Sequence, residues 1–156
     1  MNNKYVLTDE TINFFGRTLY RIKAISDFGN VTAGKFGGFI ENENNLSISD
    51  NAWVHGNALV SGNAWVHGNA WVSGNAKIYG NAWISGDADY TTIKGFGTNY
   101  RNTTFFRCKD DLVRVKCGCF FGTIPEFREQ VKKTRKGKIV DEYLMIADLM
   151  EMHFKK

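Results

Sequence analysis

Residues 51–86 read NAWVHG NALVSG NAWVHG NAWVSG NAKIYG NAWISG, so one six-residue phrase occurs six times in succession. A weaker copy, DADYTT, follows at residues 87–92. A fixed short period makes the backbone adopt the same conformation in every copy, and it therefore decides the fold before any other element is considered.

Two positions in each phrase are apolar and are expected to face a shared interior. Alternate side chains of a strand point to the same side, so the alanine and the aliphatic residue two places later both point inward. The Gly-Asn pair that follows is a turn signal, because both residues tolerate positive φ. Two inward residues and a corner predict a triangular coil with three short strands per eighteen residues, stacked at about 4.8 Å. The inward positions are Ala52, Ala58, Ala64, Ala70, Ala76, Ala82 and Ala88, with Val54, Val60, Val66, Val72, Ile78 and Ile84.

These residues resemble the hexapeptide-repeat family, in which an aliphatic residue is followed four positions later by a small one, as in Val54 with Ala58 and Ile84 with Ala88. The resemblance implies a left-handed parallel β-helix, an exception to the usual right-handed crossover, and a homotrimer. The lead-in AGKFGGFIENENNLS and the ending VKCGCFFGTIPEF also look like small hexapeptide-repeat proteins of phages and prophages.

The repeat divides the chain into three expected segments. Residues 1–45 form an N-terminal β segment with a glycine-rich lead-in, and short apolar runs predict a hairpin near Phe15–Thr18. Residues 46–92 form the left-handed β-helix of about two and a half coils, which begins where Leu46 and Ile48 take the alanine and aliphatic positions. Residues 93–156 form a C-terminal strand–helix–helix appendage, so the expected fold class is mainly β.

The appendage is expected to contain two strands and two helices. The strands cover Thr103–Lys109 and Leu112–Phe121. The first helix starts at Thr123 with a capping box and runs to about Thr134. The second, Asp141–His153, has an apolar face so wide that it must be largely covered. We expect it to cap the open end of the coil or to pack between subunits.

Net charge is +4 but unevenly placed: residues 41–90 carry −4 and residues 91–140 carry +8. Such asymmetry reflects an anionic partner or complementary contacts within an oligomer, and both interpretations stay open. An acidic repeat would repel a long polyanion, which disfavours nucleic acid and favours a small anionic ligand.

Cysteine usage and hydropathy indicate a cytoplasmic protein without metal or cofactor. The start lacks the features of a signal peptide, and no apolar run is long enough to span a bilayer. Three clustered cysteines, Cys108, Cys117 and Cys119, fit a reducing compartment. Their C-x-C spacing is not that of a zinc knuckle, and buried thiols explain them better.

The outward residue before each aliphatic position makes the three faces of the coil different. Trp53 stacks over Trp71 on one face and Trp65 over Trp83 on a second, while Leu59 and Lys77 share the third. Exposed aromatic patches of this size need a partner. Either flanking segments or a neighbouring subunit cover the tryptophans, or they form a stacking platform for a planar ligand.

His55 and His67 are the weak candidates for catalysis. Family acyltransferases use a histidine as general base on an acyl-CoA substrate, but here no inserted loop provides an acceptor site beside either histidine. On the appendage, strand alternation places Arg107 with Lys109 and Arg114 with Lys116, a patch suited to an anion.

The favoured hypothesis is therefore a non-catalytic, phage-encoded oligomeric protein that holds, and thereby sequesters, a small nucleotide-like anion at subunit boundaries. The alternatives are an acyl-CoA-dependent acyltransferase and a purely structural trimeric module. The candidate ligand-binding residues are Trp53, Trp65, Trp71, Trp83, Lys77, Tyr79, Arg107, Lys109, Arg114 and Lys116.

Overall fold

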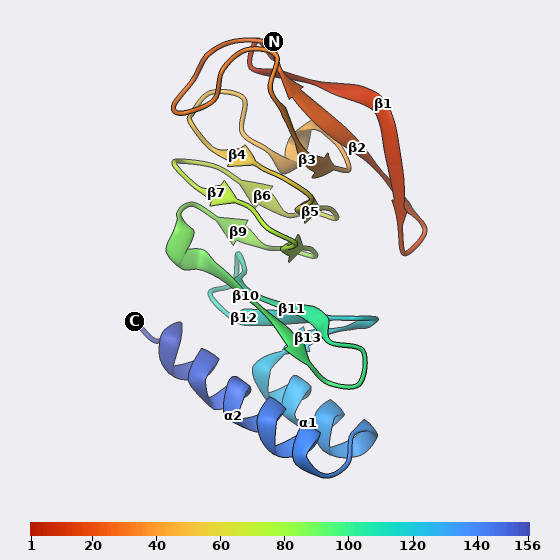
Figure 1. Ribbon diagram of the computed structural model, residues 1–156. Helices are drawn as coiled ribbons and strands as arrows, with labels where there is room; N and C mark the ends of the chain where they lie inside the picture. Colours follow the sequence, from red (N-terminus) through yellow and green to blue (C-terminus); the bar gives the residue numbers. More distant parts are fainter.

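The repeat forms three parallel ladders in the computed structural model, which describes residues 1–156 (Figure 1). In each ladder a strand pairs with the strand eighteen residues later, which confirms the predicted period. Together these ladders are called the stack below. The pairs are β4 (Trp53–Val54) with β7 (Trp71–Val72), β5 (Leu59–Val60) with β8 (Lys77–Ile78), and β6 (Trp65–Val66) with β9 (Trp83–Ile84).

The predicted inward side chains of β4 to β9 and the alanines before them are buried in one apolar cluster. Ala88 is exposed in the short helix that follows, so its predicted inward position is wrong. Small alanine beside a β-branched residue fills the narrow interior without polar atoms. The corners are tight: a Cβ added at Gly68, where φ is +69°, would lie 2.8 Å from the Ser85 carbonyl oxygen. Glycine at that corner therefore provides both the positive φ and the close approach of successive rungs.

The N-terminal segment is a hairpin that continues into the stack. Strands β1 (Tyr5–Phe14) and β2 (Arg17–Ala24) are antiparallel, and the turn between them at Phe15 and Gly16 has positive φ, close to where a hairpin was predicted. Strand β3 (Phe36–Ile40) is antiparallel to β2 but parallel to β5. The parallel pairing thus begins at Phe39, before residue 46.

The first rung is offset from the others by two residues. Phe39 pairs with Leu59 and Leu46 bridges to Val66, a separation of twenty instead of eighteen. The short helix η1 (Glu43–Asn45) lies just before this bridge. The two additional residues fall between Leu46 and β4, so Leu46 takes the aliphatic position. Ile48 is 41% exposed, and the prediction that it faces inward is wrong.

A four-stranded antiparallel sheet lies under the last rung, where two strands were expected. Its first strand follows the short helix η2 (Asp87–Asp89) directly and was hidden by the decaying repeat. The predicted strand over 112–121 is broken by a turn at Gly118, where φ is +57°. The strands are β10 (Tyr90–Phe96), β11 (Arg101–Arg107), β12 (Val113–Cys117) and β13 (Phe120–Thr123).

The sheet, and not the second helix, closes this end of the stack. The Lys77 amide donates to Thr104 Oγ1 at 3.0 Å, and Ala82 bridges to Cys108. These contacts satisfy backbone groups that an open rung would leave without partners.

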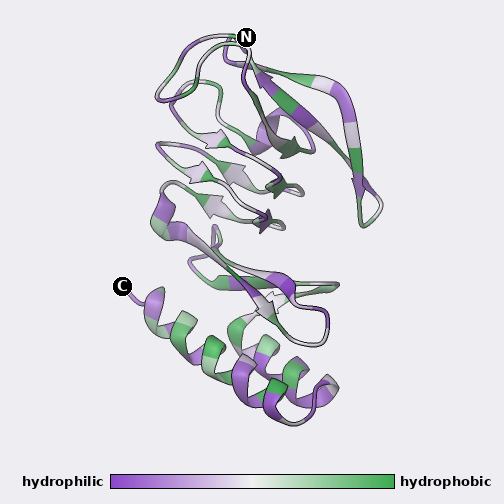
Figure 2. Cartoon of the chain, in the orientation of Figure 1, coloured by the Kyte–Doolittle hydropathy of each residue, from purple (hydrophilic) through white to green (hydrophobic).

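Two helices cover the other face of the sheet: α1 (Ile124–Thr134) and α2 (Lys138–His153). The capping box is confirmed, because the Thr123 and Glu126 side chains each accept from the other's backbone amide. Hydrophobic and hydrophilic residues alternate along both helices, as expected for helices packed on one side only (Figure 2). Part of the wide apolar face of α2 stays uncovered, however, since Met145, Leu149 and Met152 are exposed. No helix is long and apolar enough to cross a membrane.

Candidate functional site

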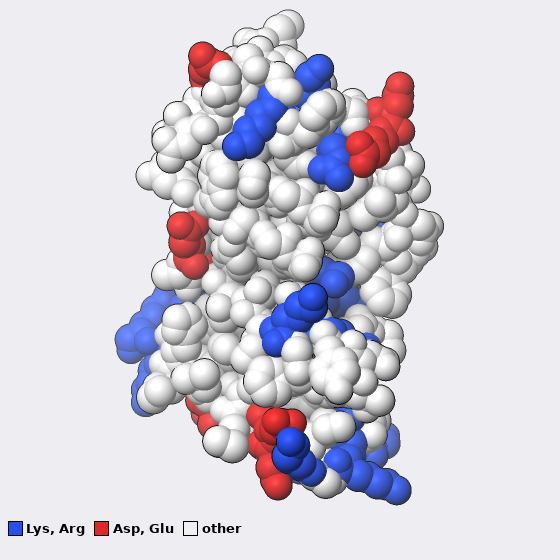
Figure 3. All heavy atoms as spheres, in the orientation of Figure 1, with Lys and Arg blue, Asp and Glu red and all other residues white.

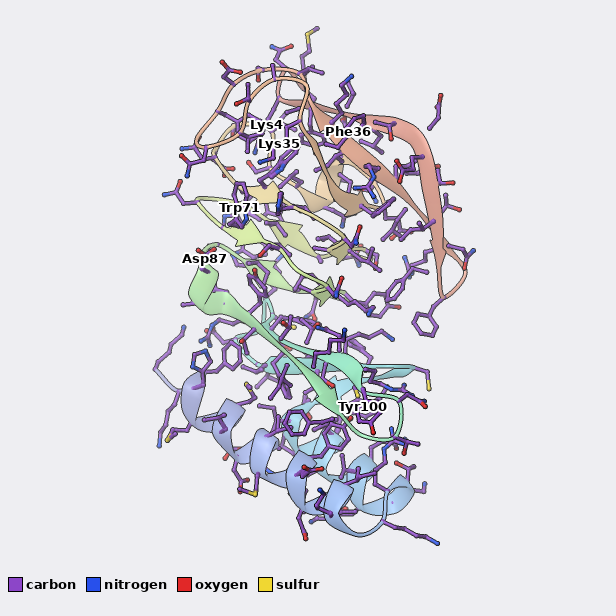
Figure 4. The ribbon with its side chains drawn as sticks, in the orientation of Figure 1. Lys4, Lys35, Phe36, Trp71, Asp87 and Tyr100 are labelled. Atoms are coloured by element: carbon purple, nitrogen blue, oxygen red, sulfur yellow. The ribbon has the colours of Figure 1, made fainter.

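The first tryptophan face is covered by the protein itself. Trp53 is fully buried, with its ring edge-on to Phe28 at 5.3 Å and to Tyr5 at 6.4 Å between centroids. Trp71, one rung below, is half-buried beside His55, at 5.2 Å. Its amide donates to Asp87 Oδ1, and the two residues lie close together at the edge of the stack (Figure 4). Trp53 therefore cannot contact a ligand.

The second face gathers three aromatic rings at the surface. The His67 ring stacks on Trp65 with centroids 3.8 Å apart and planes 16° apart. Trp83 stands edge-on to both, 4.7 Å from Trp65 and 5.2 Å from His67. Trp83 is 37% exposed, so the edge of this group is open to a partner.

A cation lies at the lower end of the same face. The Lys109 amide donates to the Asn81 carbonyl at 2.9 Å, which ties the turn after β11 to the last rung. This contact places the Lys109 ammonium 5.5 Å from the centre of the Trp83 ring. The aromatic group is thus combined with an exposed positive charge.

A shallow cleft of about 490 Å³ runs along this face beside Trp65 and Trp83. Its opposite wall is the segment from Glu43 to Ser49, which includes the exposed Ile48 and two serines. The corner with two additional residues therefore forms one wall. That wall was not foreseen from the sequence, because the offset of twenty residues becomes apparent only once β3 is paired.

The two histidines are poorly placed for catalysis. Burial lowers the pKa of His67, and its Nε2 atom is buried without a hydrogen-bond partner. His55 has a buried Nδ1 atom in the same condition. A general base must be within hydrogen-bond reach of its substrate, and one ring nitrogen of each histidine is covered by protein.

The third face brings together Lys77, Tyr79 and Lys116, three candidate residues that the sequence did not place side by side. The hairpin tip reaches this face, so that the Phe15 ring lies 4.2 Å from the Lys116 ammonium and Phe14 lies 5.6 Å from it. Sequence reasoning missed both phenylalanines. Two adjacent phenylalanines at a predicted surface turn are the signal that the tip of the hairpin contacts another part of the protein.

The remaining two arginines are engaged within the protein. Arg114 makes two hydrogen bonds of 2.9 Å to Asp110, and this pairing lowers the pKa of the Asp110 carboxyl. Arg107 contacts Asp89 at 3.4 Å and the Phe154 carbonyl. Arg107 and Arg114 are also not cross-strand partners, since Arg114 pairs with Phe106. The structure does not gather the expected strand cations into one patch.

The cysteines are separate rather than clustered around a common centre. Cys108 and Cys117 are buried, and Cys119 is exposed. The Thr103 hydroxyl donates to the Cys117 sulfur at 3.2 Å. No group of three or more His, Cys, Asp or Glu side chains has a spacing suited to a metal ion.

No protein family model matches the sequence, and no curated protein matches it. The function must therefore be inferred from the side chains and their surroundings. Among the candidate residues, Trp65 and Trp83 line this cleft, and the exposed Lys109 lies beside Trp83.

Proposed function

We propose that this chain is a non-catalytic binding protein for a small, planar, anionic ligand of the nucleotide type. The observation that carries the proposal is the group of Trp65, Trp83 and Lys109 beside the 490 Å³ cleft. Indole faces stack on nucleobases regardless of base identity, each stack contributing about 1–3 kcal/mol. A lysine ammonium is a compact charge that suits a phosphate.

We further propose that the three ladders are the sides of a left-handed parallel β-helix and that three chains associate. Eighteen-residue pairing along three separate ladders supports the winding. The open cleft supports association, because exposed Trp83 and Ile48 flank it and a neighbouring subunit would cover them. The ligand would then lie at a subunit boundary and be withdrawn from solution.

An acyltransferase is the alternative, and the surroundings of the histidines argue against it. Burial lowers the pKa of His67, but its ring is stacked on Trp65 and does not line the cleft. The cleft itself contains no histidine.

A thermal-shift screen of nucleotides and CoA esters tests the proposal. A ligand present at about 100 times its Kd should stabilise the protein by about 2.7 kcal/mol. Trp83→Ala should weaken that ligand about tenfold or more, because one stacking contact is lost. Trp71→Ala is the matched control: it changes the same repeat position on another face and should leave the affinity unchanged.

Two results would contradict the proposal. Stabilisation by acetyl-CoA accompanied by loss of the thioester would indicate the acyltransferase. A lack of response to every nucleotide tested would favour the structural module. Light scattering during size-exclusion chromatography gives the number of chains directly, and a monomer would overturn the trimer.

A further inference from the structure

Two lysines meet on the third face, where the stack joins the C-terminal sheet. Lys77 extends outward from β8, and its amide donates to Thr104 Oγ1. Thr104 lies directly opposite Lys116 on the neighbouring strand β12. The backbones of Lys77 and Lys116 therefore lie on either side of Thr104, and these two residues are called the junction lysines below. On the visible side of this junction, blue spheres gather without a red sphere beside them (Figure 3).

Neither junction lysine has an acceptor for its ammonium. Lys116 is only 5% exposed, and no hydrogen bond or ion pair is formed by its Nζ or by that of Lys77. Most other enclosed cations have carboxylate partners. These pairs are Lys4 with Asp50, Arg21 with Glu10, Arg107 with Asp89, Arg114 with Asp110, and Arg128 with Asp148 and Glu151.

The surroundings of the junction lysines disfavour two protonated ammonium groups side by side. Burial lowers the pKa of Lys116; Cys119 and Cys117 act in the opposite direction, and the neighbouring Lys77 ammonium lowers it. Burial likewise lowers the pKa of Lys77, and Arg101 adds to the effect. Like charges brought together away from water repel strongly, and a buried charge without a partner is strongly unfavourable.

An aromatic cover closes one side of Lys116. Phe15 lies 4.2 Å from the ammonium, and Phe14 and Tyr79 lie 5.6 Å from it. These rings come from the hairpin tip and from the stack, so residues far apart in sequence converge here. In Figure 1 the hairpin extends along the side of the stack toward the sheet. Aromatic faces attract a cation but provide no hydrogen-bond acceptor, so the ammonium hydrogens keep their binding capacity.

We propose that the junction lysines bind the phosphate group of a small molecule, with Phe15 as the cover of the site. A phosphate oxygen accepts hydrogen bonds from both ammonium groups, and its negative charge removes their mutual repulsion. The phosphate site lies on a different ladder from Trp65 and Trp83. The proposal therefore does not depend on whether a base binds beside Trp65 and Trp83.

The test uses inorganic phosphate as the probe and chloride at equal ionic strength as the reference. Saturating phosphate should raise the Tm by about 5–10 °C in the wild-type protein. Lys116→Met should abolish this rise, and Lys77→Met, which changes a less buried side chain, should reduce the affinity at least tenfold. Lys94→Met is the matched control, because it removes an exposed lysine from β10 and should leave the response intact.

The Tm of Lys116→Met measured without phosphate shows whether Lys116 binds phosphate or only packs against its neighbours. Without phosphate, Lys116→Met should melt no lower than wild type, since an unpaired buried charge is removed and the aliphatic stem is kept. The proposal is overturned if phosphate leaves the wild-type Tm unchanged relative to chloride. It is equally overturned if Lys116→Met and Lys94→Met respond alike, or if Lys116→Met melts lower and its phosphate response persists.

A nucleoside monophosphate distinguishes the source of the phosphate and keeps the two proposed sites apart. Trp83→Ala should lose the additional affinity of the nucleotide over phosphate only if one ligand spans both faces. If the Trp83→Ala protein binds the nucleotide and phosphate as the wild type does, the junction site is confirmed as an independent phosphate site and the proposed base platform is wrong.

Discussion

Trp53 with Trp71 and Trp65 with Trp83 occupy the same position of the same repeat and pair in the same parallel way. Nevertheless, Trp53 has no exposed surface, whereas Trp83 is 37% exposed. The repeat therefore determines the direction in which an outward side chain points but not whether that side chain is buried or exposed. The segments that precede and follow the repeat decide which face becomes core and which stays available.

Trp53→Ala should produce the largest loss of stability. It leaves a cavity between Phe28 and Tyr5, and removal of a buried tryptophan costs about 3–5 kcal/mol. Urea denaturation measures this loss. Trp83→Ala is the control and should cost less than about 1 kcal/mol; equal losses would mean that the two faces do not differ in cover.

Gly37→Ala should disturb the covered face next. An added Cβ would lie 2.5 Å from the Val54 carbonyl oxygen and 2.7 Å from the Trp53 ring. The Val54 backbone cannot move away easily, because it belongs to a strand paired within the stack. Overpacking of this kind costs about 1–3 kcal/mol. Gly86→Ala, where a Cβ meets nothing within 4 Å, should leave the Tm nearly unchanged, and a comparable drop there would remove the steric explanation.

Raising the pH from about 8 toward 10 should stabilise the protein through Lys4, which lies against the covered face. Its ammonium donates to the Ser47 and Ala52 carbonyls, and burial lowers its pKa to about 8. Between this value and the ordinary lysine pKa the unfolded chain binds more protons, so the free energy of unfolding rises with pH, by at most about 1.4 kcal/mol per unit.

The junction lysines and Tyr5 also affect how the free energy of unfolding depends on pH. The lowered pKa values of the junction lysines act in the same direction as Lys4. Burial raises the pKa of Tyr5, so the trend should reverse above about pH 10, where only the unfolded tyrosine ionises. Lys4→Met should flatten the rise in urea denaturation series, and an unchanged slope would show that Lys4 is not its source.

The smallest effect concerns fluorescence. Trp83→Phe should remove more of the emission that acrylamide quenches than Trp53→Phe does, because only the exposed indole meets the quencher. The stability of Trp83→Phe should change by less than about 0.5 kcal/mol, as for surface substitutions in general. Equal quenching losses in the two variants would show that both faces are equally shielded.

The predictions that succeeded rested on local patterns. The period of the repeat, the buried alanine and aliphatic positions from Ala52 to Ile84, the hairpin turn and the Thr123 capping box each depend on residues within one turn or one phrase. Local steric preferences and side-chain alternation are sufficient for these features.

The predictions that failed required contacts between distant segments. Strand β10 has no alternation that separates it from the end of the repeat, and the two-residue offset shows only when β3 is placed beside β5. Likewise, the cover over Trp53 and the approach of Phe15 to Lys116 join residues that no short-range pattern relates.

The hairpin has one more consequence, for how this chain can change in length. Inserting one six-residue phrase would move the C-terminal sheet to the next face, and Lys116 would no longer lie under Phe15. Inserting eighteen residues would restore the face but would move the sheet about 4.8 Å farther from the hairpin tip. Phe15 and Lys116 therefore meet only at the present length of the stack, which links the length of the repeat to the length of the hairpin.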